Sequence, residues 1–247
     1  MLMIEKDAVW QNPELVTKFL QNVRGAVPLS IEQIEMMLQL IAAAQDHGPR
    51  TFLDLGSGDG VLASAILDEY PRARGVVVEF SYPMLESARR QLHAHTHRVD
   101  FVLADFHNPD WTHKVAKLAP VDAIVSGFAI HHLYDTRKEV LYREIFDLLA
   151  PEGVFINIEH VSSAIRWTES VWDDCMIDAI FGQDLKASPG KKRAEVAREY
   201  YLRVSGDEGI VAPLEVQLDW LREAGFENVD CYLKVQELAL FGGQRPE

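Results

Sequence analysis

A glycine-rich stretch, Asp54-Leu55-Gly56-Ser57-Gly58-Asp59-Gly60, follows a short apolar run and precedes residues with helical periodicity. Glycine lets a ligand approach the backbone closely, and a turn between a strand and a helix places that ligand near the helix N-terminus. Three glycines at alternate positions therefore predict a binding loop. Taken alone, the stretch leaves open the alternative of a tight turn that binds nothing.

Acidic residues near this loop indicate what kind of ligand it takes. The dinucleotide fingerprint Gly-x-Gly-x-x-Gly lacks its third glycine here, where Val61 stands, and Asp54 would repel a pyrophosphate but attract an ammonium group. Glu79 ends an apolar run about twenty residues further on, where an acid can accept from ribose hydroxyls. Asp105 beside Phe106 can accept from an adenine amino group and stack on its ring. The residues predict adenosine with a cationic amino-acid tail, not a nicotinamide dinucleotide.

The elements that position these residues alternate regularly between short apolar runs and amphipathic segments. Such alternation predicts an α/β fold with βα units around a mostly parallel sheet. The predicted strands are 51–55, 75–79, 99–104, 121–126 and 153–159, followed by a hairpin of 228–235 and 237–242. The predicted helices are 12–23, 30–45, 61–69, 83–93, 110–118, 136–149 and 213–224.

We expect a single domain over residues 1–247. Its expected parts are an N-terminal helical cap (1–48), a cofactor-binding core (49–161), a helical lid insertion (162–212) and a C-terminal helix with a strand hairpin (213–247). The insertion contains two helical patterns separated by Gly182 and by Ser188-Pro189-Gly190. Because it follows the fifth strand, it is expected to overhang the ligand edge of the sheet.

Five motifs in order, DLGSGDG, VVVEFS, ADF, VDAIVSGFAIHHL and LLAPEGVFINIEH, resemble the class I S-adenosylmethionine-dependent methyltransferase family. The C-terminal LREAGFENVDCYLKVQELALFGGQRP and the N-terminal helices are similar to a subgroup of small-molecule methyltransferases and carboxy-S-adenosylmethionine synthase. The resemblance implies a Rossmann-like sheet of seven strands, flanked by helices, with the last strand antiparallel. It also implies S-adenosylmethionine as methyl donor and S-adenosylhomocysteine as product.

The resemblance further implies which residues hold the cofactor. The methionine part would be held by Asp54, Gly56, Gly58 and Gly60, the ribose by Glu79, and the adenine by Asp105 with Phe106. Ser57, Phe80 and Ser126 complete the predicted cofactor-binding set. Structural roles remain the alternative: Glu79 as a helix-capping acid, Asp105 as a strand end and Phe106 as a core residue.

Candidate catalytic residues follow the fourth and fifth predicted strands. His131 and His132 follow the fourth, and Glu159 and His160 end the fifth. In open α/β folds the ligand binds at this edge, where an imidazole near pH 7 can accept a proton. Methyl transfer from a sulfonium is an in-line displacement, so a base is needed only for acceptors that do not ionise easily. Helix capping, or packing beneath the cofactor, is the alternative role.

The insertion supplies the candidate acceptor residues, Trp167, Trp172, Tyr200 and Arg203. Tyr200 and Arg203 share one helical face with Arg193, so this basic, aromatic face could receive an anionic small-molecule acceptor. The alternatives are a solvated face for these residues, and for the tryptophans a place in the core or in a homodimer contact.

His93, His95 and His97 alternate in sequence and invite a metal interpretation. They stand where a predicted helix runs into a loop, and no acid or cysteine has metal-ligand spacing with them. We therefore predict a solvated turn and no metal.

Charge and composition exclude some classes of binding partner. The 38 acidic residues against 24 basic ones give a formal net charge of -14, which disfavours nucleic acid. No apolar run reaches the roughly eighteen residues of a membrane span, and Glu5 and Asp7 interrupt what would be a secretory signal. We predict a cytoplasmic protein that uses neither nucleic acid nor membrane.

The leading hypothesis is a methyltransferase that acts on a small molecule by in-line displacement. Two alternatives stay open from the sequence: an enzyme like carboxy-S-adenosylmethionine synthase, and a non-catalytic protein that binds the cofactor.

Overall fold

The computed structural model describes residues 10–18, 20, 27–163, 165–187, 190–204 and 211–247. Within this part of the chain, seven strands form one sheet in the order β3-β2-β1-β4-β5-β7-β6. The strands are β1 (Thr51–Leu55), β2 (Arg74–Glu79), β3 (Val99–Leu103), β4 (Val121–Gly127), β5 (Leu149–His160), β6 (Glu227–Val235) and β7 (Leu238–Gln244).

Strands β1 to β5 pair in parallel, and β7 runs antiparallel to both of its neighbours, β5 and β6. A short turn suffices between β6 and β7 because antiparallel neighbours need no crossover, whereas each parallel pair needs a longer connection. The predicted mostly parallel, seven-stranded sheet with a reversed last strand is confirmed.

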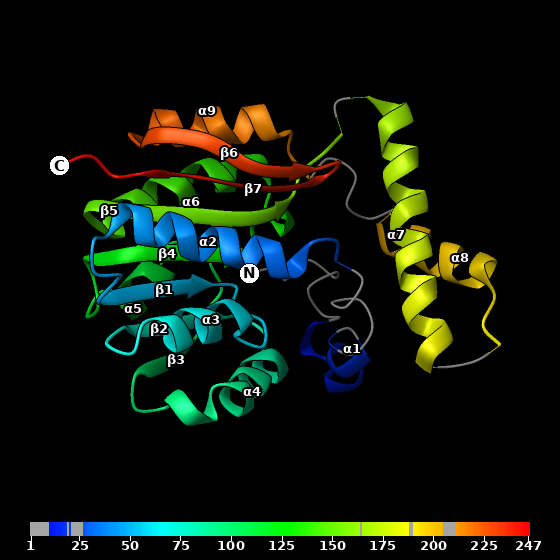
Figure 1. Cartoon of the computed structure of the whole chain (residues 1–247), viewed down its shortest axis with the longest axis horizontal. Coiled ribbons are helices and arrows are strands. Elements are labelled where there is room, and N and C mark those ends of the chain that lie inside the picture. The colour runs from blue at the N-terminus through cyan, green and yellow to red at the C-terminus, as the bar shows by residue number, and fades with distance from the viewer. Residues whose placement is uncertain (1–9, 19, 21–26, 164, 188–189, 205–210) are drawn as a thin grey trace.

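Helices cover both faces of the sheet (Figure 1). The described helices are α1 (Pro13–Lys18), α2 (Ser30–Ala44), α3 (Val61–Glu69), α4 (Tyr82–Gln91), α5 (Trp111–Val115), α6 (Asp135–Leu148), α7 (Arg166–Ala187), α8 (Arg193–Val204) and α9 (Leu214–Ala224). One core joins α2, α3 and α4 to the sheet, and the other joins α5, α6 and α9.

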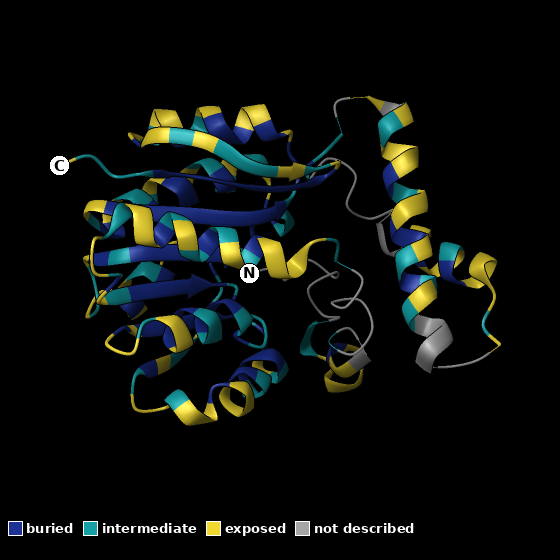
Figure 2. Cartoon of the chain, viewed as in Figure 1, coloured by how far each residue is buried: buried dark blue, intermediate teal, exposed yellow. Residues whose placement is uncertain are grey.

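Alternate residues of the central strands feed these two cores. Phe52 of β1 lies in the core under α2 and α3, while Leu53 and Leu55 lie in the core under α6 and α9. Figure 2 shows the central strands buried along most of their length. Burial on both faces explains why these strands are near-continuous apolar runs in sequence.

Most predicted elements recur with small shifts at their ends, but β5 begins at Leu149, four residues before the predicted 153, and two helices also differ. Helix α5 is shorter than the predicted 110–118, because Leu118 N–H donates to the Val115 carbonyl at 2.9 Å in a tight turn that closes it. Helix α1 ends at Lys18, and most of the predicted 19–23 extension lies outside the described residues.

The insertion forms α7 and α8, which lie beyond the end of the sheet toward which β1 points (Figure 1). Helix α7 continues through Gly182, so the predicted break there is wrong. One glycine costs a helix only about 1 kcal/mol, which the packing of α7 on α8 and on Leu238 can offset. The two ends of the insertion meet, since Ser162 bridges to Pro213 and its N–H donates to the Ala212 carbonyl at 3.1 Å.

Candidate active site

The glycine loop follows β1 and turns sharply into α3. Gly56, Gly58 and Gly60 have φ angles of +65°, +56° and +82°, a region that other residues rarely adopt. The N–H groups of Gly56 and Ser57 donate to the Val78 carbonyl at 2.8 and 3.1 Å, which fixes the loop to β2. A Cβ atom at Gly58 would meet no atom within 4 Å, so open space lies beside this glycine.

The carboxylate of Glu79, at the end of β2, lies against this loop. One oxygen accepts the Gly58 N–H at 2.9 Å, and the other accepts the Ser81 N–H at 2.8 Å. Burial raises the pKa of Glu79, although these backbone donors act in the opposite direction. Ser81, not Glu79, caps α4, because its hydroxyl accepts the Met84 N–H at 3.2 Å. The acid therefore faces the glycine loop from the second strand.

Two further side chains of the loop test whether it suits an amino-acid ligand. Asp54 is buried and one of its oxygens accepts the Ala63 N–H at 3.0 Å, so the acid sits at the start of α3. The buried Ser57 hydroxyl has no hydrogen-bond partner within the described structure. Native proteins rarely leave such a group unsatisfied, so a polar ligand beside Gly58 would supply its partner. That Asp54 and the loop hold the amino-acid end of a ligand stays a prediction.

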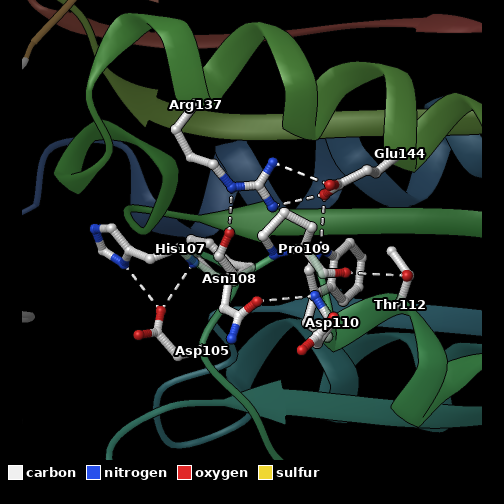
Figure 3. A network of polar contacts seen from close by, with 10 residues as sticks. Asp105, His107, Asn108, Pro109, Asp110, Thr112, Arg137 and Glu144 are labelled. Carbon is white, nitrogen blue, oxygen red and sulfur yellow. Dashed lines mark hydrogen bonds and ion pairs between the residues drawn. The ribbon is translucent and has the colours of Figure 1, made fainter. Parts of the chain in front are cut away.

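Asp105 and Phe106 follow β3 at the same edge. One Asp105 oxygen accepts the backbone N–H of His107 at 2.9 Å and lies 2.9 Å from its Nδ1, as Figure 3 shows. Burial opposes ionisation most strongly, but the bonds and charge of His107 lower the pKa of Asp105 overall. The buried Phe106 ring lies 3.4 Å from where a Cβ atom at Gly56 would stand. Phe106 therefore flanks the glycine loop, and adenine binding by Asp105 and Phe106 stays a prediction.

A network of hydrogen bonds and an ion pair holds the segment after β3 against α6 (Figure 3). Arg137 donates to the Phe106 carbonyl at 2.8 Å and forms a two-point ion pair with Glu144 at 3.1 and 2.6 Å. Glu144 also accepts the Trp111 indole N–H at 2.7 Å. Sequence reasoning missed this network, although Arg137 and Glu144 stand seven residues apart on one helix and so share a face.

His131 and Glu159 form the closest polar contact among the candidate catalytic residues. Nδ1 of His131 lies 2.6 Å from the fully buried Glu159 carboxylate, which also accepts the backbone N–H groups of His131 and His160 at 3.0 and 2.7 Å. Burial raises the pKa of Glu159, but the His131 ring and these donors outweigh it and lower the pKa. Since a carboxylate only accepts, Nδ1 carries the proton and Nε2 is the basic nitrogen of a neutral ring.

The other two histidines lie beside this pair. The His132 and His160 rings lie 4.0 and 5.9 Å from the His131 ring, centroid to centroid. Nε2 of His160 lies 2.9 Å from the carboxylate of Glu237, in the turn between β6 and β7. The four candidate catalytic residues therefore lie together at the carboxyl ends of β4 and β5. Glu237 lies beside them, which the sequence analysis did not predict. Their catalytic roles stay predictions.

Two predicted cofactor residues make contacts within the protein. The buried Ser126 hydroxyl donates to the Leu55 carbonyl at 2.9 Å, which ties β4 to β1. The half-buried Phe80 receives the Gln11 side-chain amide at its carbonyl, 3.1 Å away. A cofactor role for Ser126 and Phe80 stays a prediction.

The predicted acceptor tryptophans differ in position. Trp172 is buried on α7, with its ring centroid 6.0 Å from that of His160. Trp167, on the same helix, is 68% exposed and lies outside this contact. The structure thus brings Trp172, but not Trp167, beside the histidines.

The basic face of α8 is turned toward acids of α7. Arg193 pairs with Asp174 at 2.8 Å and with Asp178 at 2.5 Å, and the Tyr200 hydroxyl donates to Asp173 at 2.8 Å. The side chain of Arg203 lies outside the described residues. Arg193 and Tyr200 therefore join the two helices of the insertion.

His95, the middle one of the three alternating histidines, makes polar contacts with neighbouring side chains. Nε2 of His95 lies 2.9 Å from Asp68, and Nδ1 lies 2.9 Å from the Arg98 guanidinium. Among the residues that the structure describes, no group of three or more His, Cys, Asp or Glu side chains is placed to hold a metal ion. Over the same residues, no helix has the length and apolar character to cross a membrane.

Comparison with known proteins identifies methyltransferases as similar. Residues 52–153 match the family model described as a methyltransferase domain. The chain is 21% identical over 230 residues to a carboxy-S-adenosyl-L-methionine synthase of Nautilia profundicola, covering 92% of this chain and 91% of that protein. It is 27% identical over 234 residues to a trans-aconitate 2-methyltransferase of Methylobacterium radiotolerans, covering 87% and 79%.

Solved structures share the fold. An O-methyltransferase family protein from Burkholderia thailandensis matches with a TM-score of 0.67 at 16% identity, covering 98% of this chain and 63% of that one. The chain thus spans less than two thirds of the length of that structure.

The fold and the matched domain define the class I S-adenosylmethionine-dependent methyltransferases. Residues 52–153 form a domain of that kind, as the motifs predict, and its cofactor is S-adenosylmethionine.

Proposed function

We propose that this protein transfers the methyl group of S-adenosylmethionine to a hydroxyl group of a small molecule, with His131 as general base. One observation carries the proposal: Nδ1 of His131 is held by the buried Glu159 carboxylate, at the same sheet edge as the glycine loop. When bound, S-adenosylmethionine supplies a methyl group on a positively charged sulfur, open to in-line displacement. The protein then has to hold the cofactor and the acceptor, align them with one another and exclude water.

The histidine removes the proton of the acceptor hydroxyl. His131 accepts this proton at Nε2 because Glu159 keeps the other ring nitrogen protonated. Glu159 also stabilises the imidazolium that forms, since its carboxylate is buried and negatively charged. The proton then passes to water, which returns the ring to its neutral form.

The remaining site residues have proposed positions around the cofactor. Asp54 and the glycine loop would hold its methionine end, Glu79 its ribose hydroxyls, and Asp105 with Phe106 its adenine. The small size of the acceptor is supported by a relative, the trans-aconitate 2-methyltransferase. We also propose that the chain is one domain in which the 162–212 insertion covers the acceptor as a lid.

Calorimetric titration with S-adenosylhomocysteine tests the cofactor part, and we expect one binding site per chain. No binding heat at millimolar S-adenosylhomocysteine would contradict the proposal. Transfer of an isotopically labelled methyl group to a panel of hydroxyl, amine and carboxylate compounds then tests the reaction. Turnover of carboxylates alone would contradict the role of His131, because an ionised acceptor needs no base.

Two finer points of this proposal are an anionic acceptor and a homodimer. The basic face of α8 motivates the first, although Arg193 pairs with Asp174 and Asp178. The exposed apolar side chains Trp167 and Val171 on α7 motivate the second. Light scattering over a concentration series tests the dimer, and the acceptor panel tests the charge.

Carboxy-S-adenosylmethionine synthesis is the second candidate function. It is favoured by similarity to two such synthases over 92% of this chain, from Nautilia profundicola and Nitratiruptor sp.. Mass spectrometry of the cofactor that copurifies with the protein separates the two functions. The carboxylated cofactor is expected only from the synthase.

A further inference from the structure

Five aromatic rings form a continuous row along the carboxyl edge of β4 and β5. In order they belong to Trp10, His132, His131, His160 and Trp172. Successive ring centroids are 6.1, 4.0, 5.9 and 6.0 Å apart, the range in which aromatic side chains contact one another. We call this set the ring row. The candidate general base, His131, is its middle member.

The two ends of the ring row come from elements outside the sheet. Trp10 precedes α1, and its carbonyl accepts the Ser81 hydroxyl, while the next side chain, Gln11, donates to the Phe80 carbonyl at 3.1 Å. Trp172 belongs to α7 of the insertion and is only 3% exposed. The row thus joins the N-terminal segment to the insertion across the edge where the reaction is proposed.

The middle of the ring row stays accessible. The side chains of His131 and His160 are 14% and 26% exposed, and Trp10 and His132 are also partly exposed. The partly exposed rings between the two tryptophans offer an aromatic surface in which successive rings are tilted by 36° to 73° to one another. Such a surface favours a ligand with its own aromatic ring, because ring pairs gain about 0.5–1.5 kcal/mol beyond the area they bury.

Among the described residues, acids outnumber lysine and arginine near the ring row. Glu159 and Glu237 lie against His131 and His160, and the nearby buried Lys138 pairs with Asp135 at 3.0 Å. A ligand with several carboxylates would bring further negative charge beside these two glutamates. A ligand that is neutral when it binds meets no such repulsion.

We propose that the ring row receives a planar aromatic acceptor that carries a ring hydroxyl, and that this hydroxyl is methylated. The inference rests on the proposed function and specifies its substrate class. A phenolic hydroxyl has a pKa near 10 and is more acidic than an aliphatic one, so an imidazole backed by a carboxylate suffices as its base. The hydroxyl proton goes to Nε2 of His131, and the ring oxygen forms the new bond to the methyl carbon as the carbon–sulfur bond breaks.

The test compares probes that differ in one property. Catechol and cis-cyclohexane-1,2-diol share two neighbouring hydroxyls but differ in aromaticity, and trans-aconitate carries three carboxylates without a ring. Each is titrated calorimetrically into protein saturated with S-adenosylhomocysteine. We expect catechol to bind about tenfold more tightly than either other probe, a difference of about 1.4 kcal/mol.

Variants locate the preference on the ring row. Trp172→Leu is expected to abolish the catechol preference, and Trp172→Phe to retain most of it, since phenylalanine keeps an aromatic face. Trp220→Leu is the matched control, because Trp220 lies on α9, where its ring packs on Tyr142 outside the row. The control is expected to behave as wild type. Thermal denaturation with S-adenosylhomocysteine confirms that each variant is folded.

The outcomes separate this inference from the proposed function. Equal affinity for the two diols, or tighter binding of trans-aconitate, overturns the aromatic acceptor while binding of S-adenosylhomocysteine still stands. Failure to bind S-adenosylhomocysteine overturns the proposed function itself. A preference for catechol that survives in Trp172→Leu also overturns the inference, because the row would not be its source.

Discussion

The buried carboxylate of Glu159 holds His131 at two points, the ring Nδ1 at 2.6 Å and the backbone N–H at 3.0 Å. Two contacts to one carboxylate fix both the position of the residue and the tilt of its ring. The same carboxylate accepts the His160 N–H, so the ends of β4 and β5 are joined at the acid. Changing this one carboxylate therefore affects the orientation and the basicity of the histidine together.

Glu159→Gln is expected to lower the turnover of a hydroxyl acceptor by about 100-fold or more, because an amide no longer enforces the tautomer with a basic Nε2. Affinity for S-adenosylhomocysteine should persist, since the glycine loop is untouched. Labelled-methyl transfer and calorimetry measure the two effects. Wild-type turnover in this variant would show that His131 is not the base.

Glu159 also predicts a pH dependence of stability. Burial acts to raise its pKa, but His131 and the backbone donors lower it below the usual 4.5. The ionised form is therefore favoured by folding, so its contribution is complete above about pH 4.5 and is lost as the pH falls through the lowered pKa. Urea denaturation should show wild type losing stability relative to Glu159→Gln in this window. A constant difference across it would contradict the prediction.

Glu79 predicts a pH dependence of cofactor binding with a different origin. Burial raises its pKa above the usual 4.5, and ribose hydroxyls that donate to the carboxylate would favour its ionised form. Affinity for S-adenosylhomocysteine is thus expected to be full above the raised pKa and to decline as the pH falls through it. Glu79→Gln should bind about tenfold more weakly at neutral pH and lose this acid decline. Parallel pH profiles would exclude the ribose contact.

Two glycines of the loop should separate binding from stability. Gly58→Ala places a Cβ atom in open space at φ +56°, so we expect a loss of about 1–2 kcal/mol in stability but at least about tenfold in cofactor affinity. Gly60→Ala places it 2.9 Å from Leu92 and 3.4 Å from Ala88, so its main effect should be on stability. Thermal denaturation and calorimetry compare them. Equal loss of affinity would mean that the open space is not the ligand's.

Arg137 should contribute to both stability and adenine binding. Arg137→Met leaves Glu144 without its two-point partner, and we expect a loss of about 1–3 kcal/mol because the pair is only partly buried. Cofactor affinity should also fall, since the Phe106 carbonyl loses its anchor. Arg137→Lys should recover little, because lysine cannot form the paired contact. Urea denaturation and titration with S-adenosylhomocysteine test both effects, and full recovery by lysine would argue against the geometry.

Much of the fold was predictable because its signals are local. The strand ends at Leu55 and Glu79, and the helix over 61–69, follow from apolar runs, glycine spacing and a Tyr-Pro stop within a few residues. The proximity of Glu159 and His131 was also predictable, since both lie at the carboxyl ends of parallel strands, which share one edge of the sheet.

Contacts between distant side chains were not predictable. Glu237 reaches His160 over 77 residues because β7 inserts between β5 and β6, and no local pattern specifies that order. The basic face of α8 is opposed by acids of α7 only once the helices pack, so a solvated face and a helix contact look alike in sequence. Helix α7 likewise passes Gly182 because tertiary packing outweighs a weak local preference.

The closed neck of the insertion, where Ser162 and Pro213 meet, bears on how acceptor specificity can change. A segment whose two ends are neighbours can be exchanged for another of different length without moving the sheet that carries it. In the proposed function, the methyl donor is held by the glycine loop and the strands, and the acceptor by the helices of the insertion. Under the proposed function, replacing the segment between positions 162 and 213 is therefore expected to change which acceptor is methylated while the sheet stays in place.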